Sequence, residues 1–451
     1  MAWSVLSLRQ LPFSGLSVLI LIFSFSSTAT ASVGNIATSY GLLPSDVASA
    51  QALSLFNPLV SATYYNPAYL AHDSRGELTG GLLHAEQELR ADSQGGNAFA
   101  PERDGDVLQD APSSHVLIGL KTDLSSLTTF KHPLYLGFMA GVEKYGQELM
   151  AFNSKTSSEG QYLRYGQQPL FLNVGVGTKV WRGINAGLSM RVTLHSEATL
   201  TTESTVGGET SFEDLDVSAE PSMSVIAGLS MNVGETFCSV QDCWLDNLDT
   251  AFSWRSRSSS RTRVNSDVTI PGMVQGLDLG ISTLDSWVPD IYAFGVQYQL
   301  GRYRIGATAE MQAWSQLEDA LKRDTIKDQA ELEFKDILVP RLGMEVRIND
   351  MLSLTTGIAY EESPLESERS LDVNYFDNDR IVIGLGSSLQ LDSFPFLAHP
   401  IRLDFGYQYH QLKSRDFELT DSDSGGADSP YETVTAEGDV HVFNGSVTFK
   451  F

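Results

Sequence analysis

The feature that most constrains this chain is a strict alternation of apolar with polar or small side chains, which runs from Glu77 to the last residue. A period of two is the period of a β-strand whose two faces meet different surroundings. In one such stretch Leu354 and Ile358 share a face, while Gly357 and Ala359 lie on the other. The dominant pattern of the chain is therefore that of strands, each with one apolar face.

Counting these stretches yields fourteen predicted strands. An antiparallel barrel that begins and ends on the same side of a membrane needs an even number, and closure pairs every backbone group in lipid. Short connections such as 349–350 alternate with longer polar ones such as 418–434, as periplasmic turns and external loops do. We predict an all-β fold, a 14-stranded antiparallel transmembrane β-barrel over residues 75–451, with a soluble β-sandwich or propeller as the alternative. The predicted strands include long stretches at 248–268, 302–320 and 329–348.

The first 31 residues have the layout of a secretory signal peptide. Arg9 precedes an apolar stretch, Leu16–Phe25, and the small-residue site Ala29–Ala31 follows. The stretch is about ten residues long, whereas a helix that crosses a bilayer needs roughly 20. We expect residues 1–31 to be removed on export, and we expect no transmembrane helix in the rest of the chain.

The balance of charge is strongly acidic, with 30 Lys and Arg against 56 Asp and Glu and a net charge of −26. Phosphate backbones are bound by basic surfaces, so we expect no nucleic-acid partner. Acidic runs such as 421–424 fall in predicted external loops. Solvation explains them, and divalent-cation bridging to lipopolysaccharide is the alternative.

The two cysteines, Cys238 and Cys243, lie close together in a predicted periplasmic turn. An exported chain meets an oxidising compartment, so the natural interpretation is a local disulfide. A metal site would need further ligands, and this segment offers Asp242 alone. We expect a disulfide and no metal.

The sequence has no pattern of paired catalytic residues. His195, His410 and His441 are scattered over different predicted strands, and neither a Gly-x-Ser-x-Gly motif nor a metal-spaced His motif occurs. We expect no enzymatic activity and no cofactor. An outer-membrane hydrolase stays as an alternative of another class, which an exposed Ser/His/Asp set or a pair of acids would support.

The C-terminus alternates up to a terminal aromatic residue. Val447, Phe449 and Phe451 share one face of the last predicted strand. This pattern resembles the signal read by the outer-membrane barrel assembly machinery, so we predict that this machinery is a partner and that it reads Phe451.

Residues 32–74 have little strand pattern and contain the run Asn66-Pro67-Ala68. This segment resembles the hatch of the FadL family of long-chain fatty-acid and aromatic-hydrocarbon transporters, which carries an Asn-Pro-Ala motif. Further stretches that look like family motifs follow in the family's order: Ala251–Arg257, Gly295–Tyr298, Trp314-Ser315, Tyr360–Pro364 and Asp377–Gly386. The resemblance implies a monomeric barrel plugged by its own N-terminal segment, which takes up apolar compounds. Because Pro67 fixes its own φ and biases Asn66 away from helix, we expect a defined bend in the lumen where Asn66 bonds barrel groups.

A group of arginines marks the seventh predicted strand, 248–268. Phe252 and Trp254 share a face, which we assign to lipid because charge on that face is costly. The opposite, lumenal face then carries Arg255, Arg257, Arg261 and Arg263. An arginine can hold a carboxylate with two hydrogen bonds, so this column is a candidate site for a fatty-acid head group. The alternative is that these arginines pair with acidic lumenal residues such as Glu310 and Glu345.

The predicted external loop 269–287 is apolar for an exposed segment. Its apolar residues, including Met273, Val274 and Leu277, recur at roughly helical spacing. The loop either packs on the rim of the barrel or forms a groove that captures apolar ligands. These three residues are the candidate ligand contacts.

The leading expectation for function is passive uptake of hydrophobic small molecules, with long-chain fatty acids first. A monoaromatic hydrocarbon channel of the same family is the rival within transport. An adhesin or phage receptor is an alternative of a different class. Outer-membrane lipid and lipopolysaccharide are the expected surroundings of the barrel.

Overall fold

The fold is known from a computed structural model of the full chain. The structure describes residues 36–93, 112–129, 131–144, 148–154, 157–165, 169–204, 210–238, 243–268, 277–323, 332–366, 369–371, 377–391, 399–420 and 432–451. The predicted signal peptide and its cleavage site lie outside these ranges.

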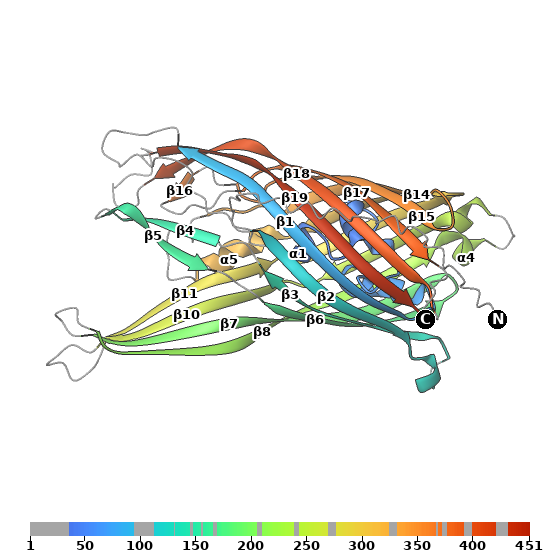
Figure 1. The fold of residues 1–451 in the computed structure, drawn as a ribbon, viewed down its shortest axis with the longest axis horizontal. Coiled ribbons are helices and arrows are strands. Elements are labelled where there is room, and N and C mark those ends of the chain that lie inside the picture. Colours follow the sequence, from blue (N-terminus) through green and yellow to red (C-terminus); the bar gives the residue numbers. More distant parts are fainter. Residues whose placement is uncertain are drawn as a thin grey trace, which may run out of the picture.

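Within the described ranges, fourteen strands pair antiparallel in sequence order and form a closed barrel (Figure 1). The barrel strands are β1 (Glu77–Ser93), β2 (Ser113–Asp123), β3 (Leu134–Lys144), β6 (Leu170–Trp181), β7 (Ile184–Ser204), β8 (Thr210–Asn232), β9 (Leu248–Arg255), β12 (Ile291–Leu300), β13 (Tyr303–Gln312), β14 (Ile337–Arg347), β15 (Leu352–Glu361), β17 (Arg380–Leu391), β18 (Ile401–Thr420) and β19 (Glu432–Lys450). The first and last strands close the wall, with Glu77 opposite Lys450 and Ser93 opposite Val434. The predicted fold class and strand number are confirmed.

The two faces of the wall follow the alternation of the sequence. Val116 and Phe294 point outward and are 65% and 53% exposed, which is the exposure of a face meant for lipid. Phe252 is also outward, at 42%, while Arg255 on the same strand is 3% exposed. The predicted parity of this strand is confirmed.

The two ends of the barrel differ in their connections. Short turns, such as the one between β14 and β15, lie at the end that carries the C-terminus (Figure 1). Most of the longer connections, including those between β3 and β6, β9 and β12, and β13 and β14, lie at the other end, whereas the connection between β8 and β9, with its helical turns at 233–237 and 244–247, lies at the same end as the short turns. We call the end with the short turns the periplasmic end and the other the outer end, because outer-membrane barrels have short periplasmic turns and longer external loops.

Among the residues that the structure describes, five further strands lie outside the fourteen-stranded wall. They are β4 (Glu148–Ser154) and β5 (Ser157–Tyr165), β10 (Ser258–Val268) and β11 (Leu277–Val288), and β16 (Arg369–Leu371). The first two pairs are antiparallel ribbons, whereas β16 pairs parallel to β18. In Figure 1 the ribbon of β10 and β11 runs outward with the long hairpin of β7 and β8.

Several predicted strands differ from the structure in their bounds, among them the three long stretches named above. The stretch 248–268 is two strands, because the chain leaves the wall after Arg255 and continues in the β10–β11 ribbon. The stretch 302–320 ends as a strand at Gln312 and continues as helical turns, and 329–348 becomes a strand only at Ile337. Alternation by itself does not distinguish a strand in the wall from one in a ribbon beyond it, since both have two faces.

The segment before β1 fills part of the lumen with short helices (Figure 1). They are α1 (Ile36–Ser39), α2 (Pro44–Ala48), η1 (Ser54–Phe56), α3 (Ala62–Tyr65) and η2 (Pro67–Ala71). Most of these residues are buried. We call residues 36–72 the hatch. The remaining helical turns are η3 (Ser125–Leu127), α4 (Val233–Phe237), η4 (Trp244–Asn247), η5 (Trp314–Gln316) and α5 (Leu317–Leu321). None of the helices in the described residues has the length and apolar character needed to span a membrane.

Candidate functional site

The Asn66-Pro67-Ala68 run forms a bend between α3 and η2. Asn66 has extended backbone geometry, and its Oδ1 accepts from the Ala68 N–H at 3.3 Å, so the side chain caps the helical turn that Pro67 opens. The Asn66 Nδ2 donates to Leu55 O at 3.1 Å within the hatch and to Leu229 O of β8 at 3.4 Å. This one amide therefore links two parts of the hatch to the barrel wall.

Three glycines on neighbouring strands form the surface that receives this bend. Gly177 of β6 is opposite Gly187 of β7, which is opposite Gly228 of β8. A Cβ at Gly228 would lie 2.1 Å from Asn66 Oδ1, and one at Gly187 would lie 2.3 Å from the Pro67 carbonyl carbon. The hatch therefore reaches the wall at a distance that only a residue without a side chain permits. We call these three residues the glycine slot.

The rest of the hatch meets glycines on other strands in the same way. A Cβ would lie within 3.0 Å of a hatch atom at Gly119, Gly137, Gly295, Gly306, Gly343, Gly357, Gly384, Gly386 and Gly406. Sequence reasoning missed this contact surface. Its signal was present, because these glycines lie at lumenal positions of strands whose other lumenal residues are mostly polar.

The hatch is held in shape by a buried carboxylate. Asp46 Oδ2 accepts from the Leu43 N–H, and Oδ1 accepts from Ser54 Oγ at 2.8 Å and Asn57 Nδ2 at 3.1 Å. Asp46 is fully buried, so these bonds satisfy an acceptor that water does not reach. They tie α2 to the turn that follows η1.

Buried charges of the wall enclose one hatch ring. Arg191 of β7 pairs with Glu143 of β3 at 2.8 Å, and both side chains are almost fully buried. Its guanidinium carbon lies 4.4 Å from the centre of the Phe171 ring and 5.4 Å from that of Tyr64. Arg255 approaches Tyr64 as well, at 5.0 Å. The ring of Tyr64 thus contacts two cations of the wall, and we call this arrangement the Tyr64 clamp.

The predicted arginine column is only partly realised in the structure. Arg255 forms a buried ion pair with Glu310 of β13, whose other oxygen lies 3.7 Å from Arg341 Nη2. This is the alternative expected from the sequence, in which an arginine pairs with an acidic lumenal residue. Arg304 likewise pairs with Glu345, at 2.7 Å.

The other three arginines do not share a wall strand with Arg255. Arg257 lies after the end of β9, is exposed, and donates from Nη1 to Gln316 Oε1 at 2.7 Å. Arg261 and Arg263 lie on β10, where their side chains are outside the described part of the structure. The prediction of one lumenal column was therefore wrong, because the chain leaves the wall after Arg255. Carboxylate binding by these residues stays a prediction.

A large apolar cluster lies at the outer end of the lumen. It is made by β11, the helical turns after β13, and the outer parts of β14, β18 and β19. Its members are Trp287, Trp314, Leu317, Ala320, Leu321, Leu332, Phe334, Ile337, Val339, Leu365, Phe417, Val434 and Ala436, with Leu284 packed against them. We call it the outer apolar cluster. Trp314 Nε1 donates to Gln312 Oε1 at 2.7 Å, so its indole is oriented while its ring stays in the cluster.

The predicted capture loop is placed differently by the structure. Leu277 begins β11, so the helical spacing expected around it is wrong, because this part of the loop pairs with β10 as a strand. Met273 and Val274 lie outside the described residues. The later residues of the same segment, Leu284 and Trp287, reach the outer apolar cluster.

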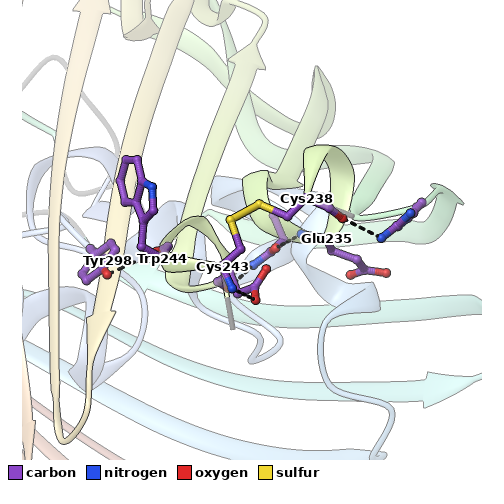
Figure 2. Close-up of a disulfide and its surroundings, with 8 residues drawn as sticks. Glu235, Cys238, Cys243, Trp244 and Tyr298 are labelled. Carbon is purple, nitrogen blue, oxygen red and sulfur yellow. Dashed lines mark hydrogen bonds between the residues drawn. A yellow bond between two sulfur atoms is a disulfide. The ribbon is translucent and has the colours of Figure 1, made fainter. Parts of the chain in front are cut away.

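Cys238 and Cys243 are joined by a disulfide at the periplasmic end, between α4 and η4 (Figure 2). The turn is also tied to its neighbours. Tyr298 OH donates to Trp244 O at 3.2 Å, and Lys179 pairs with Glu235 at 2.6 Å. This hydrogen bond from the Lys179 ammonium lowers the pKa of Glu235.

The end of the chain completes the barrel wall at the periplasmic end. Phe451 N donates to Gly76 O at 3.0 Å and Gly76 N donates to Phe451 O at 2.9 Å. The Phe451 side chain is 52% exposed. Recognition of Phe451 by the assembly machinery stays a prediction.

Comparisons with known proteins agree with this architecture. Residues 246–451 match the family described as "Outer membrane protein transport protein (OMPP1/FadL/TodX)". The chain is 51% identical over 444 residues to Alkane uptake protein A of Marinobacter nauticus. This match covers 97% of this chain and 96% of the Marinobacter protein.

Solved structures show the same fold at low identity. A FadL homologue of Pseudomonas aeruginosa matches with a TM-score of 0.61 at 14% identity. The match covers 90% of this chain and 98% of the homologue. The toluene transporter TodX of P. putida has a TM-score of 0.53 at 11% identity, covering 91% of this chain and 99% of its own. At these identities the likeness concerns the fold alone.

The fold and these matches define a β-barrel of the bacterial outer membrane, closed by fourteen strands, with its own N-terminal segment in part of the lumen. The chain belongs to the FadL/TodX family of outer-membrane transport proteins, and it is a channel for the uptake of hydrophobic compounds. Membership in this family also confirms the expectation of a transporter rather than an enzyme.

Proposed function

We propose that this channel takes up neutral, long-chain aliphatic hydrocarbons. The observation that carries the proposal is the 51% identity, over nearly the whole chain, to a protein named for alkane uptake. The interior of the barrel supports the proposal. Arg255, which the parity of β9 places in the lumen, is already paired with Glu310 and therefore does not need a carboxylate of the ligand as its partner. A neutral ligand needs no charged partner.

The outer apolar cluster supports the same proposal. An alkane binds through apolar area alone, at roughly 25 cal/mol for each Å² removed from water. The cluster contributes two tryptophans, Phe334 and Phe417, and several aliphatic side chains at the outer end of the lumen. A ligand that enters there would next meet the hatch at the Tyr64 clamp and the glycine slot, so we propose that the hatch shifts during passage.

Long-chain fatty acids are the second candidate. Arg257 favours them, because it is exposed at the outer end and bonds Gln316, which adjoins Trp314 and Leu317 of the outer apolar cluster. An acid whose chain lay in the cluster would have its carboxylate near this cation. Monoaromatic compounds stay the third candidate, supported by the family and not by a feature specific to this chain.

Three ligands test the proposal, and two of them, hexadecane and hexadecanoate, are matched in chain length. Uptake of labelled hexadecane, hexadecanoate and toluene would be measured in a strain without its own channel, with and without this chain. We expect hexadecane uptake to depend on the chain and to be unchanged in Arg257→Gln. Uptake of hexadecanoate that is lowered by Arg257→Gln, together with no chain-dependent uptake of hexadecane, would favour the acid and overturn the alkane proposal.

A further inference from the structure

A polar cavity of about 420 Å³ lies at the outer end, away from the hatch. It is bounded by the loop before β14, the loop after β15, the start of β17 and a bulge in β18. Its lining residues are Lys335, Ser363, Leu365, Glu366, Asp379, Lys413, Ser414 and Arg415. We call it the rim pocket.

Two of the stretches that resemble family motifs, Tyr360–Pro364 and Asp377–Gly386, meet at this pocket. The stretch Tyr360–Pro364 contributes Ser363, whose N–H donates to Asp379 Oδ1 at 2.9 Å. Tyr360 OH donates to the other oxygen of Asp379, at 2.7 Å. Arg415 Nη1 donates to Leu365 O at 2.9 Å. The walls of the pocket are therefore built by hydrogen bonds and do not depend on a ligand.

One lysine beside the bulge in β18 lies on the outside of the barrel. Pairing between β18 and β19 is interrupted between Leu412 and Arg415. On the β17 side the register continues, with Lys413 N donating to Asp379 O at 2.8 Å, and Asn378 Nδ2 donates to Lys413 O at 2.7 Å. The Lys413 Nζ lies 4.5 Å from the centre of the Tyr360 ring, and the parity of β15 places that ring on the outward face.

The lining of the pocket has one more cation than carboxylates, and a further carboxylate, Glu362, lies beside Lys335. Three cations line the pocket, against two carboxylates, in a chain with a net charge of −26. Asp379 already accepts from Tyr360 and Ser363. The Lys413 Nζ lies 3.0 Å from the Tyr360 hydroxyl oxygen and 3.5 Å from Asp379 Oδ2. The Lys335 Nζ lies 3.6 Å from Glu362 Oε2. An ammonium group has three donors, so both lysines can bind a further anion.

An apolar panel lies directly below the pocket on the lipid face. Along β15 and β17, Tyr360 is opposite Ile381 and Ile358 is opposite Ile383, one step further into the membrane. Ile358, Ile383 and Leu385 are 49%, 43% and 53% exposed. A ligand of the outer leaflet with an anionic head and acyl chains would contact both the pocket and the panel.

We propose that the rim pocket binds a phosphate group of lipopolysaccharide, whose acyl chains lie along the panel of Ile358, Ile383 and Leu385. Lysine binds phosphate as a point charge, and basic clusters at the edge of a membrane-spanning surface are sites for anionic lipid heads. Lys413 and Tyr360 lie on the outer face of the wall, whereas Leu365 of the pocket lining also belongs to the outer apolar cluster. Lipid binding at the rim pocket would fix the position of the outer loops relative to the leaflet.

The test uses the full-length protein in detergent with EDTA, so that no divalent cation can bridge acidic residues to the lipid. The probe is lipid A carrying both phosphates, and the comparison is the same lipid after phosphatase treatment. We expect the phosphorylated form to bind at least about tenfold more tightly. The double variant Lys335→Gln/Lys413→Gln should remove that difference.

The matched control is Lys144→Gln/Lys179→Gln, which removes two lysines from other parts of the barrel, one on β3 and one on β6. It should bind phosphorylated lipid A like the parent. Equal losses in both double variants, or equal binding of the two lipids by the parent, would overturn the proposal. Displacement of bound lipid A by hexadecanoate in the parent would also overturn it, because the pocket would then be a substrate site.

Discussion

The guanidinium carbon of Arg255 lies 5.0 Å from the centre of the Tyr64 ring, which connects the barrel wall to the hatch in the middle of the lumen. Arg191 contacts the same ring from another strand. Both arginines are buried and each is paired with a glutamate, so their charges are shielded from water but stay attractive to an aromatic face. The position of the hatch is therefore coupled to two ion pairs of the wall.

Replacement of Tyr64 by leucine should loosen the hatch. A desolvated cation–π contact contributes about 1–2 kcal/mol, and Leu has no ring to supply one. We expect amides of residues 36–72 to exchange with deuterium about tenfold faster or more in Tyr64→Leu, while the barrel strands keep their protection. Tyr64→Phe keeps the ring and loses the hydroxyl that bonds Thr38 Oγ1, so its exchange should stay closer to that of the parent. Equal exchange in the parent and Tyr64→Leu would show that the ring contributes nothing to hatch stability.

A single methyl group in the glycine slot should displace the Asn66 bend. A Cβ at Gly228 would lie 2.1 Å from Asn66 Oδ1, so either the hatch or the wall must move, and forced overpacking costs about 1–3 kcal/mol. We expect Gly228→Ala to change the uptake rate and to raise hydrogen exchange around residue 66. Gly445→Ala is the matched control, because a Cβ there meets no atom within 4 Å. If the two variants behave alike, close approach at the slot has no role.

Loss of the Asn66 side chain should reduce uptake without reducing barrel assembly. Asn66→Ala removes the donor to Leu55 O and Leu229 O and the acceptor for the Ala68 N–H. Leaving a buried polar group without its partner costs about 1–3 kcal/mol. Uptake assays would measure the loss, and the different gel mobility of heated and unheated protein would show that the barrel is closed. Unaltered uptake of every ligand would contradict the role assigned to this residue.

The loop beside the rim pocket should respond to pH through Asp377. Burial raises the pKa of Asp377 to about 6, although the charge of Arg380 and the hydrogen bond from Ser363 oppose the rise. A raised pKa means that the folded loop binds the proton more tightly than the unfolded chain does. Protonation of Asp377 therefore stabilises the folded loop. This stabilisation is fully present below the unfolded pKa of about 4 and is lost as pH rises through the folded pKa of about 6.

We therefore expect hydrogen-exchange protection of residues 362–366, corrected for intrinsic rates, to fall severalfold between pH 4.5 and 7. Asp377→Asn keeps an oxygen for the Ser363 hydroxyl and does not titrate in this range, so its protection should be independent of pH. A parent protein with flat protection over the same range would contradict the raised pKa.

The sequence alone determined the class of fold and the faces of the wall. Alternation is a local property, since neighbouring side chains of a strand point to opposite sides, and a barrel in lipid must make one side apolar. Fourteen strands, the outward Phe252 and the lumenal Arg255 followed from that pattern. The cysteine pairing was also accessible to sequence reasoning, because Cys238 and Cys243 are only five positions apart.

Tertiary structure decided what the sequence pattern leaves open, which is where the chain leaves the wall and which distant residues meet. The ribbon after Arg255 has the same alternation as a wall strand, so only its pairing with β11 reveals the break. Arg255 and Glu310 are 55 positions apart, and Gly177, Gly187 and Gly228 adjoin only through strand register. Such contacts depend on the register of the strands and on the position of the hatch inside the closed sheet. A periodicity of two in the sequence predicts neither the register nor the position.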